Sequence, residues 1–300
     1  MRIVRPHTSV DRVGITGVVT RFVRGLRTGG VRDLGLLLVL LAAVAGIVFA
    51  IDPRLDLRLT SLFFDDATRS FPAASDPVAL WLRGKSMWIF TAFAVLVAAM
   101  VIARLVLPLP VFPVPARSVV FLALTLALGP GLLVNGVLKE HWARPRPGAV
   151  VEFGGTLPFV PWWDPRGGCD QNCSFVSGET SGATWSVAPA LLVPGAARVV
   201  ALSAAGIFTV AIATLRIAFG GHFASDVIFA VLLTLAVIWA IYSLAFRVDW
   251  MRLQTGPLPR IVRRAITRWG RTESNLIAYG DWTTALRFGD PSTPPAPLSD

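Results

Sequence analysis

The sequence is poor in charged residues and almost lacks lysine. Of its 300 residues only 15% are Asp, Glu, Lys or Arg, whereas 54% are hydrophobic, and the mean hydropathy is +0.64. This composition excludes the ordinary soluble class and indicates an integral membrane protein. The net charge is +10, but Lys85 and Lys139 are the only lysines, so the chain has no lysine-rich surface for nucleic acid. We therefore expect no nucleic-acid partner.

The hydrophobic residues form six blocks, and a membrane span needs about 20 apolar residues. We expect helices at about Leu34–Ile51, Met87–Leu107, Val119–Leu138, Thr184–Pro194, Val199–Ala218 and Ser225–Phe246. The fourth is short and is expected to begin earlier, inside the polar stretch CSFVSGETSG (173–182). Buried helices of a large soluble core are the alternative, but six such blocks in one small chain do not suit it. The prediction is an all-α, polytopic bundle of six transmembrane helices.

Arginines flank this bundle at both ends. They are Arg2, Arg5, Arg12, Arg21, Arg24, Arg27 and Arg32 before it, and Arg247, Arg252, Arg260, Arg263, Arg264, Arg268, Arg271 and Arg287 after it. The positive-inside rule then places both termini in the cytoplasm. We expect a basic cytoplasmic segment (1–33), a six-helix membrane domain (34–246) and a second basic cytoplasmic segment (247–300) with a disordered, proline-rich end. The two basic segments are expected to contact anionic lipid headgroups.

With this topology three loops face outward, at about Asp52–Lys85, Lys139–Gly182 and Arg216–Phe223. We expect the first to consist of short amphipathic pieces at the membrane interface. The second contains the only cysteines, Cys169 and Cys173, which can form a disulfide in an oxidising compartment if the local geometry allows it. Zinc binding would need further ligands to converge on the two cysteines.

The third loop brings unusual polar residues to the membrane edge. His222 and Asp226 are four residues apart at the start of the last helix, so they share a face. A carboxylate there can fix the tautomer of the imidazole, which suits a nucleophile or a base, whereas a structural ion pair is the alternative. Arg216 lies at the end of the preceding span, where a charge is costly unless it is paired, near an edge or functional.

The second loop adds cations and a polar turn. The stretch KEHWARPRP supplies Lys139, Arg144 and Arg146, which suit a phosphate or, alternatively, lipid headgroups. The stretch SFVSGETSG can form a backbone nest for an anion at a helix N-terminus, or Ser177 or Thr180 can simply cap that helix. Because the two loops emerge on one face, these residues can converge on a site for phosphoryl transfer through a covalent histidine intermediate.

The order and spacing of these residues resemble the motifs of the type 2 phosphatidic acid phosphatase (PAP2) superfamily, which includes bacterial lipid phosphatases. The first motif, Lys-x6-Arg-Pro, matches Lys139 and Arg146. The third, Ser-Arg-x5-His-x3-Asp, matches Arg216, His222 and Asp226. The resemblance implies that the three cations hold the phosphate, that His222 attacks phosphorus and that Asp226 orients the imidazole.

The second motif, Pro-Ser-Gly-His, matches only in part, as Val-Ser-Gly-Glu at 176–179. The resemblance implies that Ser177 and the Gly178 N–H help to hold the phosphate. In the family the histidine of this motif protonates the leaving oxygen, and Glu179 can serve as that acid if its surroundings favour the protonated form. The alternatives are a hydrogen-bonding role for Glu179, with the proton supplied by His141 or water, and an impaired enzyme.

We therefore expect a metal-independent lipid phosphatase without a cofactor, in a bacterial inner membrane, with its active site facing the periplasm. Arg144 would be an auxiliary residue, and Leu215 stands where the family has serine, which removes one hydrogen bond. The expected substrate is a phosphorylated membrane lipid: undecaprenyl diphosphate, phosphatidylglycerol phosphate, phosphatidic acid or a lipid A phosphate. A phosphotransferase with the same intermediate and an impaired phospholipid-binding protein are the alternatives. Transport suits the sequence less, because the charges gather near one membrane edge.

Overall fold

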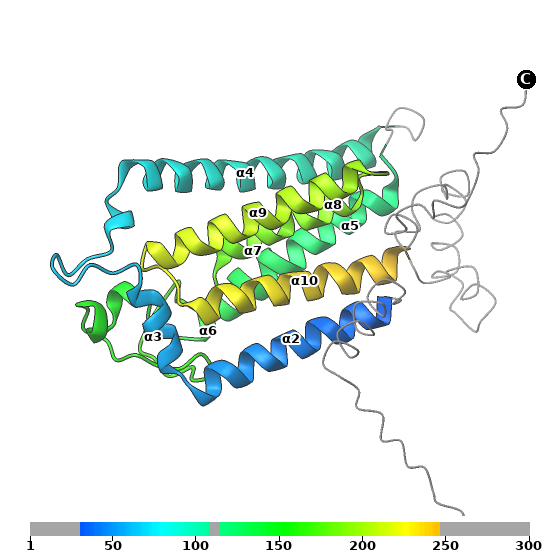
Figure 1. The fold of residues 1–300 in the computed structure, drawn as a ribbon. Coiled ribbons are helices and arrows are strands. Elements are labelled where there is room, and N and C mark those ends of the chain that lie inside the picture. The colour runs from blue at the N-terminus through cyan, green and yellow to red at the C-terminus, as the bar shows by residue number, and fades with distance from the viewer. Residues whose placement is uncertain (1–30, 108–113, 247–300) are drawn as a thin grey trace, which may run out of the picture.

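The computed structural model describes residues 31–107 and 114–246, and these ranges are helical apart from the connecting loops (Figure 1). The longer helices are α2 (Val31–Ile51), α3 (Arg54–Ser61), α4 (Pro77–Val106), α5 (Ala116–Leu126), α7 (Gly178–Trp185), α9 (Ala197–Ala218) and α10 (Ala224–Phe246). The remaining helical elements are η1 (Pro72–Ala74), the π-helix η2 (Ala127–Leu138), α6 (Lys139–His141), η3 (Pro147–Ala149), η4 (Val151–Phe153) and α8 (Val187–Leu191). The basic segments expected at 1–33 and 247–300 lie almost entirely outside the described residues, as do their predicted lipid contacts.

Within the described ranges, five helices are long and apolar enough to cross a membrane. They are Asp33–Ile51, Pro77–Val106, Ala116–His141, Ala197–Ala218 and Ala224–Phe246. Their outer faces are apolar and exposed, as on α4 and α9, where Leu105 is 81% and Ile207 71% exposed. A helix face of this kind is stable against lipid rather than water. The chain is therefore a multi-pass membrane protein.

The sixth expected span is shorter than a membrane crossing. Helix α7 begins inside the polar stretch, as the sequence predicts, but the helix breaks at Ser186 and α8 ends at Leu191. The Ser186 N–H bonds to the carbonyl of Ala183, three residues back and not the four of an α-helix, and Pro189 has no N–H to donate. Fourteen residues rise only about 21 Å, against a hydrocarbon core of about 30 Å. The expectation of six full spans is thus not met in the described residues.

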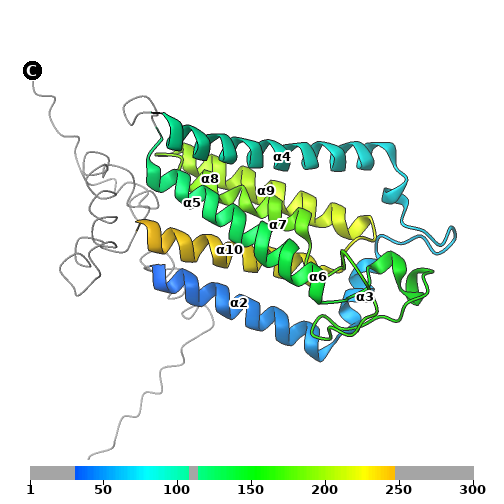
Figure 2. The ribbon, with the colours of Figure 1, turned by 180° about the vertical axis from the view of Figure 1, so that it is seen from behind.

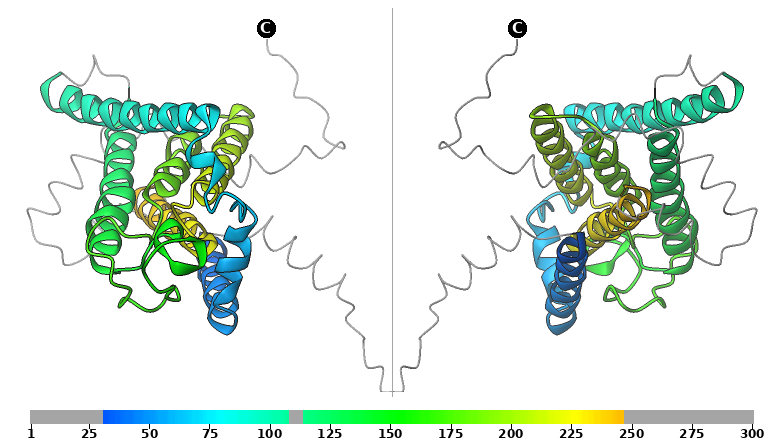
Figure 3. Two further views of the ribbon diagram at one scale, coloured as in Figure 1. Left: turned by 90° about the vertical axis from the view of Figure 1, so that its left-hand side faces the viewer. Right: turned by 90° about the vertical axis from the view of Figure 1, so that its right-hand side faces the viewer.

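The pair α7 and α8 forms the centre of the bundle instead (Figures 1 and 2). Trp185 and Ala188 are buried among α4, α5 and α10, and the Trp185 indole donates to the Thr125 hydroxyl at 3.0 Å. Helix α2 packs along α10, and α4 is inclined across the opposite face, as the view along the bundle shows (Figure 3). A helix pair too short to cross a membrane is possible here because the neighbouring helices surround it.

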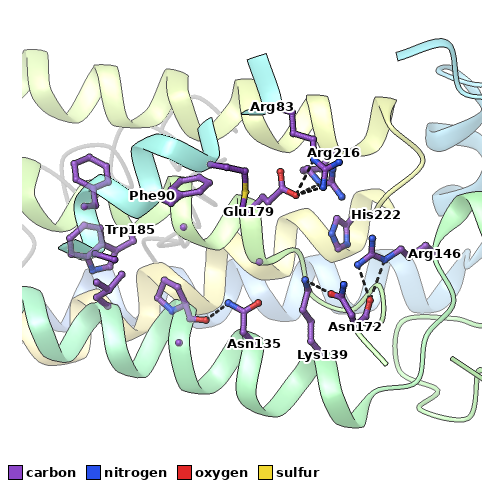
Figure 4. A pocket seen from close by; sticks show the side chains of 18 residues that line it. Arg83, Phe90, Asn135, Lys139, Arg146, Asn172, Glu179, Trp185, Arg216 and His222 are labelled. Atoms are coloured by element: carbon purple, nitrogen blue, oxygen red, sulfur yellow. Dashed lines mark hydrogen bonds and ion pairs between the residues drawn. The ribbon is translucent and has the colours of Figure 1, made fainter. Parts of the chain in front are cut away.

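Helix α4 begins ten residues earlier than the sequence analysis placed it. Pro77 stands at the first helical position, and the Asp76 side chain accepts the Ala79 N–H at 2.7 Å, which is a complete N-terminal cap. The segment that we read as part of an interfacial loop is therefore helical. As a result Arg83 lies on α4 and faces the interior of the bundle (Figure 4).

The long loops of the described residues gather at one end of the bundle (Figures 1 and 3). Helix α3, the loop from Trp142 to Ser177 and the turn between α9 and α10 lie there, and Phe71, Val150, Phe153 and Phe223 form a small core beneath them. The described chain ends, at α2 and α10, lie at the opposite end of the bundle. This arrangement brings the second and third outer loops together, as the topology predicts.

Candidate active site

A cavity of about 490 Å³ opens at the loop end of the bundle, between α4, η2, α7 and α9 (Figure 4). Its walls divide by chemistry. The polar wall consists of Arg83, Asn135, Lys139, Arg146, Asn172, Glu179, Arg216 and His222. The apolar wall includes Met87, Phe90, Phe93, Leu126 and Trp185. Such a cavity fits a ligand with an anionic group and an apolar body.

Two of the expected cations are held in place by a single loop residue. The Lys139 ammonium donates to the Asn172 side-chain oxygen at 2.8 Å, and the Arg146 guanidinium donates to the Asn172 carbonyl at 2.8 Å and 3.2 Å. Partial burial and the charge of Arg83 lower the pKa of Arg146, but an arginine keeps its charge at neutral pH. The loop therefore presents two fixed positive charges to the cavity.

The third expected cation, Arg216, meets Glu179 from the other side. The Arg216 Nε lies 3.5 Å from Glu179 Oε1, and Arg83 donates to the same oxygen from Nε at 3.3 Å and from Nη2 at 3.1 Å. Arg216 is almost fully buried, and its Nε makes no hydrogen bond. The Glu179 side chain thus lies between two guanidinium groups that line the cavity (Figure 4).

His222 is fixed by a backbone carbonyl. Its Nδ1 lies 2.7 Å from the carbonyl oxygen of Ser174, which can only accept, so Nδ1 carries the proton and Nε2 has the free lone pair. Burial, reinforced by the positive charges of Arg216, Lys139 and Arg146, holds the pKa of His222 well below its ordinary value of 6.5. At neutral pH the imidazole is therefore neutral, as a nucleophile must be.

Comparison with known proteins agrees with this geometry. Residues 118–250 match the model of the PAP2 superfamily. The chain is 33% identical over 205 residues, 68% of its length, to a lipid A 4'-phosphatase of Francisella tularensis subsp. novicida (strain U112), of which it covers 91%. The chain belongs to the PAP2 superfamily. It is also 42% identical over 120 residues, 40% of its length, to a lipid A 4'-phosphatase of Rhizobium leguminosarum, of which this match covers 52%. No solved structure matches.

The sequence predicts that the Asp226 carboxylate contacts the imidazole of His222, but the two groups do not form a hydrogen bond. Asp226 Oδ2 lies 4.0 Å from His222 Nδ1, beyond hydrogen-bond distance. The carboxylate instead accepts from Arg144 at 2.5 Å, from the Ser174 hydroxyl at 2.5 Å and from the Phe223 N–H at 2.8 Å. Its acceptor sites face these donors, so Asp226 acts on His222 indirectly, through Ser174 and through the Phe223 N–H of the peptide that follows His222.

Three other predicted residues lie away from the cavity lining. Ser177 is buried and caps α7, since its hydroxyl accepts from the Thr180 N–H at 3.3 Å, whereas Gly178 beside it does line the cavity. Arg144 is fully buried between two carboxylates, so it is not free to bind a phosphate. His141 is exposed, and its ring nitrogen contacts the Val137 carbonyl at 2.8 Å.

The loop that carries Asn172 is closed by a disulfide between Cys169 and Cys173. The Cys169 N–H donates to the Ala143 carbonyl at 3.0 Å, and the Cys173 N–H donates to the Lys139 carbonyl at 3.2 Å. Asn172, with a φ of 49°, lies just before the second cysteine. The disulfide thus closes the turn that holds Lys139 and Arg146.

Sequence reasoning missed Arg83, Asn135 and Asn172 as lining residues. The Asp76–Pro77 pair is a helix-start signal that would have placed Arg83 on a helix. Asn135 is a lone amide in an apolar span, which is itself a signal, and it donates to the Pro130 carbonyl at 2.7 Å. No sequence pattern marks Asn172 as a lining residue, because its contacts with Lys139 and Arg146 depend on the backbone turn in which it lies.

Proposed function

We propose that this PAP2 phosphatase removes a phosphate from a lipid A-type glycolipid through a phosphohistidine intermediate, at the periplasmic face of the membrane. One observation carries the proposal: Lys139, Arg146 and Arg216 line the same cavity as the neutral imidazole of His222. The lipid phosphatase activity follows from the family and its relatives, and the glycolipid substrate is what the names of the two relatives suggest.

The first step is attack by His222 on phosphorus. The Nε2 lone pair forms a P–N bond while the P–O bond to the lipid breaks, and the fixed cations neutralise the charge on the phosphoryl oxygens. Because the Nδ1 proton is held by the Ser174 carbonyl, the imidazole keeps its orientation as it becomes positively charged. Water then attacks the phosphohistidine and releases inorganic phosphate.

Glu179 is proposed to supply the proton to the leaving oxygen. A phosphate that enters the cavity competes with the carboxylate for Arg83 and Arg216, so Glu179 loses its pairing and gains a neighbouring negative charge. Both changes favour the protonated form of a carboxyl group. The proton passes to the lipid oxygen, and the next water molecule returns one to Glu179.

Phosphate release by the purified protein tests this function. The four lipid classes are undecaprenyl diphosphate, phosphatidylglycerol phosphate, phosphatidic acid and phosphorylated lipid A, each assayed with and without a chelator. We expect the highest kcat/KM on lipid A, with loss of one phosphate in the mass spectrum, no effect of the chelator, and no release by His222→Ala. Folded protein that releases no phosphate from any class contradicts the proposal, and transfer of phosphate to another lipid without release indicates a phosphotransferase.

A further inference from the structure

A carboxylate outside the PAP2-matched residues is buried beside the site. Asp56, on α3, is 1% exposed, and it contacts Arg144 Nη2 at 2.8 Å, the Ser225 N–H at 2.8 Å and the Ser225 hydroxyl at 2.6 Å. The family match begins only at residue 118. Nothing in the three motifs requires a buried acid from this part of the chain.

The contacts of Asp56 continue, one after another, to the nucleophile. Arg144 joins Asp56 to Asp226, and Asp226 accepts the Ser174 hydroxyl. The Ser174 N–H donates to the Arg144 carbonyl at 2.8 Å, so both the backbone and the side chain of Ser174 are held by this group. The Ser174 carbonyl, in turn, accepts the Nδ1 proton of His222.

Asp56 also holds the chain on the other side of His222. Its Oδ1 accepts the N–H of Ser225, in the first turn of α10, which begins two residues after His222. A negative charge at that position is favoured by the helix dipole. Asp56 therefore restrains the imidazole from two directions, through the Ser174 carbonyl and through the start of α10.

The charges explain why Arg144 needs a second carboxylate. Arg144 is fully buried, its Nη1 and Nη2 face Asp226 and Asp56 respectively, and its Nε donates to the Val160 carbonyl at 3.1 Å. Planar guanidinium geometry makes such a fork rigid. Without Asp56, Nη2 of Arg144 would lose its carboxylate partner in the protein interior. Nη1, which holds Asp226, would then lose its fixed position.

We infer that Asp56 is a positioning residue for His222, acting through Arg144, Asp226 and Ser174. This inference rests on the proposed function, in which His222 is the nucleophile. It gives α3 a role in catalysis, because α3 supplies the one member of the group that lies before the PAP2-matched residues.

The test compares Asp56→Asn with Asp66→Asn, a matched change at a 93% exposed carboxylate in the loop after α3. We expect Asp56→Asn to lower kcat about 10- to 100-fold, because small misplacement of a nucleophile has effects of that size. KM and inhibition by inorganic phosphate should change little, since Lys139, Arg146 and Arg216 bind the phosphate. Asp66→Asn should behave as the wild-type protein.

Ser225→Ala provides a milder test that keeps all charges. It removes the hydroxyl that contacts both Asp56 and Arg144, at 2.6 Å and 2.8 Å, and should lower kcat less than Asp56→Asn does. If Asp56→Asn does not fold, this variant decides the question. Unchanged kcat in the folded variants would overturn the positioning role of Asp56, and so would equal losses in kcat and phosphate affinity. Neither result would affect the proposed function. An inactive wild-type protein would overturn the proposed function as well.

Discussion

Glu179 and its two arginines, Arg83 and Arg216, form one group in the wall of the cavity. Arg83 and Arg216 approach the same oxygen, Oε1, while Oε2 is buried without a hydrogen-bond partner. A buried carboxylate oxygen without a donor is costly. In the role proposed for Glu179, a proton on Oε2 is shared with the leaving oxygen of the substrate, which gives Oε2 the hydrogen-bond partner that it lacks.

Glu179→Gln should therefore affect substrates according to their leaving group. With a lipid alkoxide as the leaving group, we expect kcat to fall about 10²- to 10⁴-fold, because general acid catalysis has that size. With an aryl phosphate, whose leaving group needs no proton, the loss should be small. Steady-state kinetics on the two substrates measure the difference, and equal losses on both would show that Glu179 only positions Arg83 and Arg216.

How much of the site the sequence predicts depends on the residue. Lys139, Arg146, Arg216 and His222 line one cavity, because each lies at a motif position whose spacing is set by a helix or a short loop. The partner of His222 could not be predicted, because the carbonyl of Ser174 comes from backbone geometry that no side chain encodes.

The neutral state of His222 predicts a dependence of stability on pH. The folded pKa lies well below 6.5, so below about pH 6.5 the unfolded chain binds a proton that the folded chain does not. Stability should be lost as the pH falls through this range, until the folded pKa is passed. The melting temperature in detergent, measured from pH 7.5 to 5.5, should fall more steeply for the wild-type protein than for His222→Asn, and equal slopes would contradict a buried neutral imidazole.

At the scale of elements, the turn closed by the disulfide holds Lys139 and Arg146, two of the cations that we propose bind the phosphate. Asn172 orders both Lys139 and Arg146, and the disulfide fixes the turn around it. Ordering one long side chain is worth about 0.5–1.5 kcal/mol. This corresponds to a change of about two- to twelvefold in affinity.

Replacing Cys169 and Cys173 together by serine should accordingly raise KM about two- to twelvefold while kcat changes less. The reason is that Ser174, which holds His222, has anchors of its own in the Arg144 carbonyl and the Asp226 carboxylate. Reductant should raise the KM of the wild-type protein in the same way and leave the double variant unaffected, which is the matched control. An unchanged KM in the double variant would show that Asn172 keeps its position without the disulfide.

The element ends were less predictable than the elements themselves. The cores of α2, α9 and α10 follow from long apolar runs, and their bounds differ from the predicted ones by a few residues at most. Helices α4 and α7–α8 differ more, because a cap at Asp76 extends the first and the Ser186–Pro189 region breaks the second. Local hydrogen bonds, which hydropathy does not report, decide both cases.

At the scale of the whole molecule, the site occupies one end of the bundle and the described chain ends lie at the other (Figure 1). The side of the membrane on which the site lies is therefore tied to the side of the termini. The arginines of 1–33 and 247–300 favour a cytoplasmic location for the termini, since basic segments are retained on that side. The site is then predicted to face the periplasm.

Single reporter cysteines measure this orientation in spheroplasts. Asp66→Cys lies in the loop whose Phe71 packs near Phe223 at the site end, and we expect it to react with a membrane-impermeant maleimide in intact spheroplasts. Ser9→Cys should react only after the membrane is permeabilised. The wild-type protein is the control, because its two cysteines are joined in a disulfide and should not react. The opposite pattern would place the site in the cytoplasm, where a periplasmic lipid phosphate could not reach it.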